Sequence, residues 1–312
     1  MAAWLKRKRT EGVVDVKELQ ETLGRLNFAA NAIDHVSPFL GPIYAWVASV
    51  PLESVLPLPK MLSLIFLFLE KVFGDPSLRV SHAKCPKGFE GPEEDSFRGD
   101  AKAEGEDVGL GGWESRGGQK TEEAPWFYVK LTRQNAPWAF EGGEPYRKIA
   151  SLELLTSLLA VMAFNPLDEG PATKLSLSGS NGMRGLTDNL GNRYVVRALA
   201  TTAFPLCCIL MELSIQLLRR NAYLSLDWVP REGNKEADAL SEGSFHGFDP
   251  AKRIEVDLAS MKFEVLNELL EHGAELYSII RQGKAVKDRY VAPKPKAKKR
   301  KLEDKLKTKD PW

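Results

Sequence analysis

Apolar residues recur at helical spacing in two stretches near the start of the chain. Leu19, Leu23 and Leu26 lie on one side of the stretch 14–36, with charged residues between them. The run at 52–73 has a similar pattern. Apolar residues three and four positions apart form one face of an α-helix, so both stretches are predicted to be helical.

The pattern changes after the second of these helices. Clusters of Pro, Gly and charged residues fill 74–96, which is typical of a linker. Three short segments follow at 96–103, 107–115 and 125–132, rich in aromatic or β-branched residues and separated by Gly or charged turns. This arrangement predicts three antiparallel strands.

The remaining chain alternates between helical and strand-like segments. The strongest helical pattern covers 146–164 and is followed by a turn-rich loop at 165–182. Further strands are predicted over 182–188 and 222–230, and further helices over 193–220, 234–241 and 256–281. From the first strand onward, the predicted order is β-β-β-α-β-α-β-α, with one more helix near the end.

Length and composition allow one large domain or two smaller ones. The chain has 312 residues, and its apolar share of 43% is enough for a substantial core. Its net charge of +1 gives no overall indication of a partner. The segment 291–312 is Lys-rich and nearly free of large apolar groups, so it cannot bury enough surface to order itself.

Several classes of protein fit the sequence poorly. The basic N-terminus lacks a following apolar segment, which argues against a secretory signal. The three cysteines, Cys85, Cys207 and Cys208, form no CxxC pair, which argues against a zinc site and fits a reducing compartment. We therefore expect a nuclear or cytoplasmic protein that is not secreted.

Two long apolar runs raise the question of a membrane span. The run at 61–73 is too short to cross a bilayer. The run at 198–218 contains Pro205 and Glu212, which favours a buried amphipathic helix. We expect no membrane partner.

Four acidic residues occupy related positions in the predicted elements. Asp100 lies in the first strand, Glu153 on the apolar side of the first helix after the strands, Asp188 at the end of the fourth strand and Asp238 on the short helix after the fifth. A charge on a core-facing stripe costs several kcal/mol unless it is paired or metal-bound. Two structural alternatives stay open: Glu153 at the edge of the stripe with its carboxylate in water, and Asp188 as an ordinary strand-end residue.

Taken together, these carboxylates suggest a metal site. Clustered carboxylates repel one another, and without a cation at least one of them holds its proton. A hard divalent ion removes this cost, since Mg²⁺ prefers oxygen ligands. Two such ions about 4 Å apart can activate water and stabilise a leaving alkoxide in phosphodiester cleavage. Two Mg²⁺ ions, with Mn²⁺ as the alternative, are therefore the expected cofactors.

The order of elements and two short motifs resemble the ribonuclease H family. The motifs are "TDN" around Asp188 and "NKEAD" ending at Asp238; the longer segment "WVPREGNKEADALS" is similar to the final part of ribonuclease H domains in reverse transcriptases of DIRS-like and pararetrovirus-like retroelements. The segment 23–46, "LGRLNFAANAIDHVSPFLGPIYAW", resembles the thumb-to-connection region that precedes ribonuclease H in those polyproteins. Together the similarity covers about 14–245.

The resemblance implies a fold and a set of site residues. The fold is α/β, a ribonuclease H-like mixed five-stranded sheet flanked by helices and preceded by a small helical segment. The implied catalytic residues and metal ligands are Asp100, Glu153, Asp188 and Asp238. The expected substrate-binding residues are Asn234, Arg231 and Asn189. Arg231 stands in a loop where many cellular members carry a His, and Asn234 has a helix cap as its alternative role.

The resemblance also implies a division of the chain. We expect a thumb/connection-like helical segment over 1–85, a linker over 86–95 and a ribonuclease H-like domain over 96–245. A helical extension over 246–290 and a disordered basic tail over 291–312 complete the chain. The tail contains "KAKKRK", which fits a nuclear import signal or a nonspecific polyanion contact.

The expected function is metal-dependent cleavage of the RNA strand of RNA–DNA hybrids by the C-terminal part of a reverse transcriptase polyprotein. No Tyr-x-Asp-Asp polymerase motif is present. Other parts of the polyprotein are the remaining expected partners. The alternative is a catalytically inactive nucleic-acid-binding or connector module derived from a retroelement. A transposase- or integrase-type nuclease fits "NKEADALS" poorly.

Basic and aromatic residues are weaker candidates for nucleic-acid contacts. The candidate phosphate contacts, each with a solvated surface cation as its alternative, are Lys102, Arg184, Arg193, Arg197 and Arg231. The tryptophans expected in the core or in strand pairing rather than on a base-stacking surface are Trp113, Trp126 and Trp138.

Overall fold

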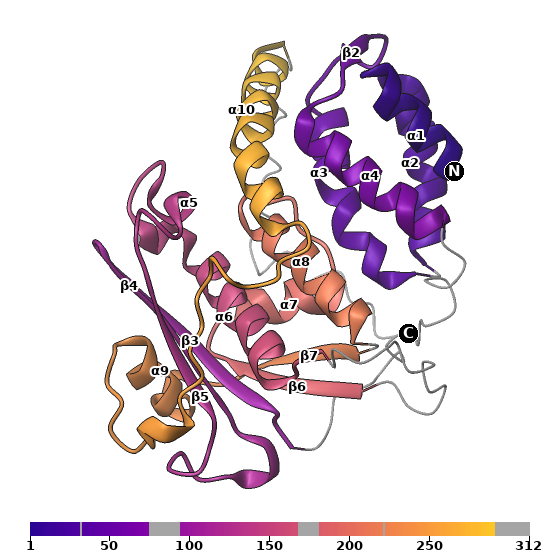
Figure 1. The fold of residues 1–312 in the computed structure, drawn as a ribbon. Helices are drawn as coiled ribbons and strands as arrows, with labels where there is room; N and C mark the ends of the chain where they lie inside the picture. The colour runs from indigo at the N-terminus through magenta and orange to yellow at the C-terminus, as the bar shows by residue number, and fades with distance from the viewer. Residues whose placement is uncertain (32, 75–93, 168–180, 221, 291–312) are drawn as a thin grey trace, which may run out of the picture.

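The computed structural model describes residues 1–31, 33–74, 94–167, 181–220 and 222–290. They form an N-terminal helical part and a sheet with helices on both faces, and a long C-terminal helix lies beside both (Figure 1). The expected linker falls largely outside the described residues, and the expected basic tail falls entirely outside them.

The N-terminal part consists of four helices and a two-stranded sheet. The helices are α1 (Ala2–Glu11), α2 (Val16–Ala30), α3 (Ser37–Val47) and α4 (Lys60–Gly74), and β1 (Val13–Asp15) pairs antiparallel with β2 (Val55–Pro57). The helices predicted over 14–36 and 52–73 are therefore shorter than expected. The Asp15 side chain accepts a hydrogen bond from the Glu18 backbone N–H at 2.9 Å, which fixes the start of α2 just after β1.

The central sheet has five strands in mixed orientation. They are β3 (Phe97–Glu104), β4 (Asp107–Glu114), β5 (Trp126–Leu131), β6 (Asn181–Thr187) and β7 (Ala222–Trp228). The order is β5-β4-β3-β6-β7; β3, β4 and β5 are antiparallel, whereas β6 runs parallel to both β3 and β7. This confirms the expected mixed five-stranded sheet preceded by a helical segment.

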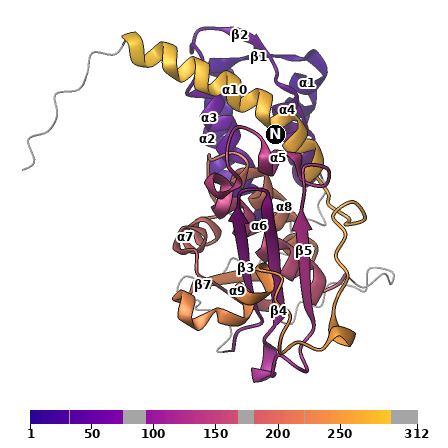
Figure 2. The same cartoon turned by 90° about the vertical axis from the view of Figure 1, so that its left-hand side faces the viewer.

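Helices cover both faces of this sheet. On one face α6 (Ile149–Phe164) packs against β3 and β4, with α8 (Leu206–Arg219) behind it. On the opposite face the short α9 (Lys235–Ser241) lies across β3, β4 and β5 (Figures 1 and 2). Because α6 lies between the sheet and α8, it is buried on nearly all sides rather than on one apolar stripe.

The predicted helix over 193–220 is two helices. α7 (Leu190–Ala198) ends where Leu199 adopts a left-handed conformation with φ 47°, and α8 begins after Pro205. A left-handed residue cannot continue a right-handed helix, and Pro is tolerated only in its first turn. Both helices bury an apolar face, so the apolar pattern continues across the break between them. For this reason the periodicity of the sequence did not reveal the break.

Short helical segments complete the fold. They are α5 (Pro137–Phe140) and the 3₁₀ turns Asp34–Val36, Arg116–Gly118, Pro145–Lys148, Arg231–Gly233 and Pro250–Lys252. Cys207 and Cys208 are buried and free, and Cys85 lies outside the described residues. In the parts of the chain that the structure describes, no helix has both the length and the apolar character needed to cross a bilayer.

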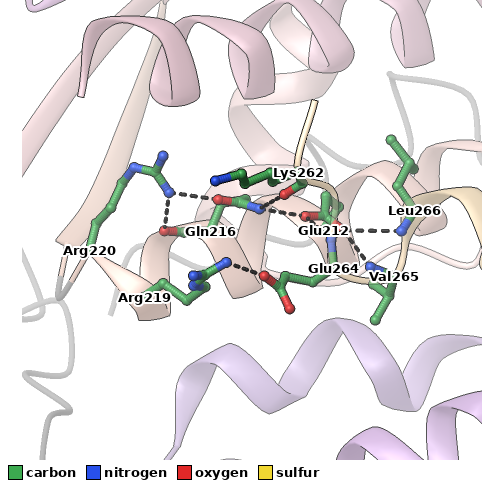
Figure 3. A network of polar contacts seen from close by, with 8 residues as sticks. All are labelled: Glu212, Gln216, Arg219, Arg220, Lys262, Glu264, Val265 and Leu266. Carbon is green, nitrogen blue, oxygen red and sulfur yellow. Dashed lines mark hydrogen bonds and ion pairs between the residues drawn. The ribbon is translucent and has the colours of Figure 1, made fainter. Parts of the chain in front are cut away.

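The C-terminal helix α10 (Leu266–Tyr290) starts ten residues later than the predicted helix over 256–281. Its start is set by Glu212 of α8, whose carboxylate is fully buried. The backbone N–H groups of Glu264, Val265 and Leu266 all donate to it at 2.9–3.1 Å, and Gln216 donates at 2.7 Å (Figure 3). An anion at this end of a helix satisfies N–H groups that have no partner within the helix.

Two glycines bring α10 close to both parts of the molecule. A Cβ at Gly273 would lie 2.3 Å from the ring of Phe204, and one at Gly283 would lie 2.3 Å from the backbone oxygen of Ser49. Only a residue without a side chain permits these approaches. α10 therefore packs against α8 on one side and against α3 and α4 on the other.

Candidate active site

Asp100 and Asp188 are brought together by the parallel pairing of β3 with β6. The two strands pair at Phe97 with Gly185 and at Arg98 with Leu186. Continuing this register by two residues places Asp100 level with Asp188, at the point where the strands separate. Side chains two positions apart on a strand share a face, so both carboxylates lie on the same side of the sheet at this opening.

Glu153 reaches the same opening from α6. Its side chain is only 4% exposed, so it lies in the core rather than at a wet edge of the helix. The Thr187 hydroxyl donates to Glu153 Oε2 at 3.4 Å, and the Ala101 backbone N–H also hydrogen-bonds the carboxylate. These contacts hold the carboxylate toward β3 and β6.

Asp100, Glu153 and Asp188 together form what we call the acidic cluster. One carboxylate oxygen from each residue lies within 4.8 Å of the others; Asp100 and Glu153 are buried and Asp188 is half-buried. The sequence predicted that four distant acidic residues lie close together, and three of the four do so in the structure.

Burial and mutual repulsion raise the pKa values of the acidic cluster. Burial raises the pKa of Asp100 to about 6; Asp188 and Asp238 add to the rise, whereas the hydrogen bond from Ser241 opposes it. Burial, and then the charges of Asp100 and Asp188, raise the pKa of Glu153 well above its usual range. The pKa of Asp188 is also raised, mainly by burial. Without a cation, the folded chain disfavours full ionisation of the cluster.

The geometry and chemistry of the acidic cluster fit a hard divalent cation. Two oxygens bound to one Mg²⁺ at about 2.1 Å lie at most about 4.2 Å apart, so the observed spacing needs only a small closure. The donors are all carboxylate oxygens, which Mg²⁺ and Mn²⁺ prefer over softer ligands. Asp100, Glu153 and Asp188 are the residues that can hold such an ion.

Asp238 lies close by but has a different partner. It is outside the acidic cluster and forms an ion pair with Arg231, whose side chain is 68% exposed. Both residues still act on the acidic cluster electrostatically, because Asp238 raises and Arg231 lowers the pKa values of Asp100 and Asp188. The expected fourth metal ligand is therefore near the site but held by a guanidinium group.

Asn234 precedes α9 but does not cap it with its side chain. It is 1% exposed, and its amide Nδ2 donates to the backbone oxygen of Gly99 at 3.1 Å. The buried Oδ1 atom has no hydrogen-bond partner among the described residues. Asn234 thus ties the start of α9 to β3, one residue before Asp100.

The "TDN" motif divides its roles among three neighbouring residues. Thr187 donates to Glu153, Asp188 belongs to the acidic cluster, and the Asn189 side chain accepts a hydrogen bond from the Asn192 backbone N–H at 3.2 Å. Asn189 is thus the N-cap of α7. The motif ends one strand, supplies one acid and starts the next helix.

Most of the candidate phosphate contacts have acidic partners in the structure. Lys102 pairs with Glu104 and Asp107, and Arg184 and Arg193 both pair with Asp227. The candidate tryptophans lie in apolar surroundings as expected: Trp113 and Trp126 are buried, and Trp138 packs partly buried against the core.

Sequence reasoning missed two hydroxyl groups that touch the acidic cluster, those of Thr187 and Ser241. The hydroxyl of Ser241, at the end of α9, donates to Asp100 Oδ2 at 2.6 Å, and Ser241 is 2% exposed. Its position in "NKEADALS" gave no indication of this contact, because the contact depends on where α9 rests on the sheet.

No family model and no curated protein matches the chain. Among solved structures, the chain is similar to ribonuclease H1 from the halophilic archaeon Halobacterium salinarum NRC-1, with 16% identity over 47% of this chain and 94% of that chain, at a TM-score of 0.30. At this identity and TM-score, the likeness supports no conclusion about function.

Proposed function

We propose that the chain is a divalent-metal-dependent nuclease that hydrolyses the RNA strand of RNA–DNA hybrids. The observation that carries this proposal is the convergence of Asp100, Glu153 and Asp188 at the opening between β3 and β6. Two buried carboxylates and a half-buried one in the same place are unfavourable without a cation. Oxygen-only ligands favour Mg²⁺, with Mn²⁺ as the alternative.

Each residue of the site has a proposed role. Asp100, Glu153 and Asp188 would hold the catalytic cation, and Thr187 keeps Glu153 turned toward the opening. Asp238 would supply the fourth ligand in exchange for its ion pair with Arg231. Two bound Mg²⁺ ions would supply an activated water and stabilisation of the departing 3′ oxygen.

The proposed substrate follows from the sequence resemblance and the charges near the site. The exposed guanidinium of Arg231 lies beside the acidic cluster, where it can contact a phosphate of the bound strand. Asn189 is the second proposed substrate contact, at the start of α7. Recognition of the RNA strand would rest on the 2′-hydroxyl and on groove shape, and binding would weaken with salt.

The proposed organisation places the nuclease domain at 96–245. The helical segment 1–85 and the extension 246–290 would flank it, with 86–95 as a linker and 291–312 as a basic tail. Origin from the C-terminal part of a retroelement reverse transcriptase polyprotein rests on the resemblance of 23–46 and of the segment ending at Ser241. The basic tail weakly favours a nuclear location.

A second candidate function is a catalytically inactive nucleic-acid-binding or connector module. The ion pair between Arg231 and Asp238 favours it, because this pair withholds one carboxylate from the cation. Under this hypothesis the chain binds nucleic acid, but the acidic cluster does not bind the cations in a catalytically active arrangement.

Strand-specific cleavage of a labelled hybrid tests the proposal directly. Wild-type chain, Asp188→Asn and the matched control Asp107→Asn are incubated with a hybrid labelled on each strand, with Mg²⁺ or with EDTA. We expect Mg²⁺-dependent cleavage of the RNA strand alone, lowered more than about 100-fold by Asp188→Asn because a ligand of the ion is lost. Asp107 is exposed and paired with Lys130, so its substitution should leave the rate unchanged.

Two outcomes would contradict the proposal. Cleavage that survives Asp188→Asn would remove the acidic cluster from the chemistry. Hybrid binding without cleavage in Mg²⁺ or Mn²⁺ would favour the inactive binding module. Duplex DNA and duplex RNA of the same sequence serve as substrates that should remain intact.

A further inference from the structure

Two glycines in β4 let the end of α9 rest directly on the sheet. A Cβ at Gly111 would lie 2.5 Å from the backbone N of Ser241 and from Leu240 Cβ. A Cβ at Gly109 would lie 2.1 Å from the backbone oxygen of Ser241. Real Cβ atoms do not approach so closely, so these positions accept only glycine while α9 stays where it is. The Gly-rich segment "DVGLGGW" therefore forms a seat for α9.

This seat lies directly beside Asp100. Gly111 is the cross-strand partner of Asp100 in the antiparallel pairing of β3 with β4. Side chains of such partners point to the same face, and with no side chain on Gly111 the space beside Asp100 is filled by α9. Ser241 is the α9 residue that occupies it, and its hydroxyl donates to Asp100 Oδ2 at 2.6 Å.

We propose that Ser241 is a positioning residue that orients the Asp100 carboxylate for cation binding at the acidic cluster. This inference rests on the proposed function. The Ser241 hydroxyl engages one named oxygen of Asp100 and thereby restricts rotation of the carboxylate. Both residues are buried, at 2% and 5% exposure, so no solvent competes freely for this hydrogen bond.

Hydrogen bonds hold α9 to β3 at both of its ends. Ser241 lies on the same short helix as Asp238, and its hydroxyl is 2.8 Å from the Asp238 backbone oxygen. Asn234 fastens the other end of α9 to Gly99 on β3. α9 is thus fixed at both ends to the strand segment that carries Asp100. Its placement decides how the acids of α9 and β3 face one another.

The effect of Ser241 is measured as Mn²⁺ affinity without nucleic acid, by electron paramagnetic resonance of free Mn²⁺ or by calorimetry. Hydrogen-bond partners of metal ligands typically change metal affinity 10–100-fold when removed. We expect Ser241→Ala to weaken Mn²⁺ binding about tenfold and Ser241→Thr, which keeps the hydroxyl, to restore most of it. In the Asp100→Asn background, Ser241→Ala should cause no further loss of affinity.

Ser214→Ala is the matched control. Ser214 is also a fully buried helical serine, and its hydroxyl donates to the His35 backbone oxygen at 2.7 Å, in a part of the molecule away from the acidic cluster. Ser214→Ala should lower the melting temperature in EDTA, as Ser241→Ala does, but it should leave the affinity for Mn²⁺ unchanged. This separates positioning from a merely structural role.

The possible failures are distinguishable. If the wild-type chain binds Mn²⁺ and cleaves hybrids but Ser241→Ala binds Mn²⁺ equally well, this inference is wrong and the proposed function stands. If Ser214→Ala weakens Mn²⁺ binding as much as Ser241→Ala, the effect is general destabilisation and the inference is again wrong. A wild-type chain that binds no Mn²⁺ overturns the proposed function and this inference with it.

Discussion

Arg231 forms an ion pair with Asp238 at the edge of the acidic cluster. The guanidinium group lies near Asp100 and Asp188 and lowers the pKa of both, so it acts as an internal counter-charge. A bound divalent cation would compete with it for Asp238. The side chain of Arg231 is 68% exposed, so its guanidinium is available to a phosphate of the substrate.

Replacing Arg231 should therefore have two opposite effects. Arg231→Ala removes a positive charge beside the cation, so we expect Mn²⁺ to bind a few-fold more tightly in calorimetry without nucleic acid. The same variant should bind an RNA–DNA hybrid more weakly and with a smaller salt dependence, because a phosphate contact is lost. Arg197→Ala, which removes an exposed cation from α7, is the control for Mn²⁺ affinity. Unchanged Mn²⁺ affinity in Arg231→Ala would mean that the ion pair does not compete with the cation.

The raised pKa of Asp100 predicts how stability changes with pH in EDTA. Its pKa is about 6 in the folded chain against an ordinary 3.8, so between these values the folded chain binds more protons than the unfolded chain. The contribution of Asp100 to the free energy of unfolding therefore falls as pH rises from about 4 to above 6. Asp100→Asn removes this loss. The free energy of unfolding of Asp100→Asn, relative to that of wild type, should therefore be higher at pH 7.5 than at pH 4 by up to roughly 3 kcal/mol.

Urea unfolding at the two pH values provides the measurement. Asp107→Asn is an informative control, because hydrogen bonds from Lys130 and Lys102 lower the pKa of Asp107. Stability from Asp107 is lost mainly below pH 4, so its substitution should change stability by nearly the same amount at pH 7.5 and pH 4, with any small difference opposite in sign to that of Asp100→Asn. An Asp100→Asn effect of equal size at both pH values would show that burial and the neighbouring carboxylates do not raise the pKa of Asp100.

Mg²⁺ should raise the melting temperature, since it relieves repulsion that exists only in the folded state. At a free concentration ten times the dissociation constant, the expected stabilisation is about 1.4 kcal/mol. Glu153→Gln removes one ligand and should reduce this shift. Glu122→Gln, at an exposed position, should keep it. The check is a thermal melt across millimolar Mg²⁺, and melts that do not move would count against a formed cation site.

The placement of Asp188 could be predicted from the sequence because a short motif fixes it to the end of a strand. "TDN" ends a strand and starts a helix, and the parallel register of β3 and β6 then sets Asp188 beside Asp100. The order of strands and the mixed sheet follow from the same elements. These features follow from the local pattern of residues and from the family resemblance, which can both be recognised in the sequence.

Other features depend on contacts between residues far apart in the sequence. The seat for α9 requires Gly111 and Ser241 to meet, and the start of α10 depends on Glu212, 54 positions before Leu266. The break between α7 and α8 was hidden because both helices are apolar on their buried faces. Periodicity reports burial, but it does not report which distant group will end or begin a helix.

Glu212 therefore gives the sharpest test of how α10 is held. Glu212→Ala leaves three backbone N–H groups at the start of α10 without their acceptor, in a fully buried position. Unsatisfied buried donors cost about 1–3 kcal/mol each, partly relieved by water, so we expect a loss of roughly 3 kcal/mol in urea unfolding. Glu212→Gln keeps one acceptor oxygen and should lose less.

Hydrogen exchange locates the effect. Amides 264–266 should lose protection in Glu212→Ala at a free energy well below that of global unfolding, because the first turn of α10 opens by itself. Glu271→Ala, at an exposed position on the same helix, should change neither the stability nor the exchange of these amides by a comparable amount. Since α10 packs against α8 as well as against α3 and α4, loosening its start should also reduce the cooperativity between the N-terminal helices and the sheet. Unchanged protection at 264–266 would show that neighbouring contacts, rather than the Glu212 carboxylate, fix where α10 begins.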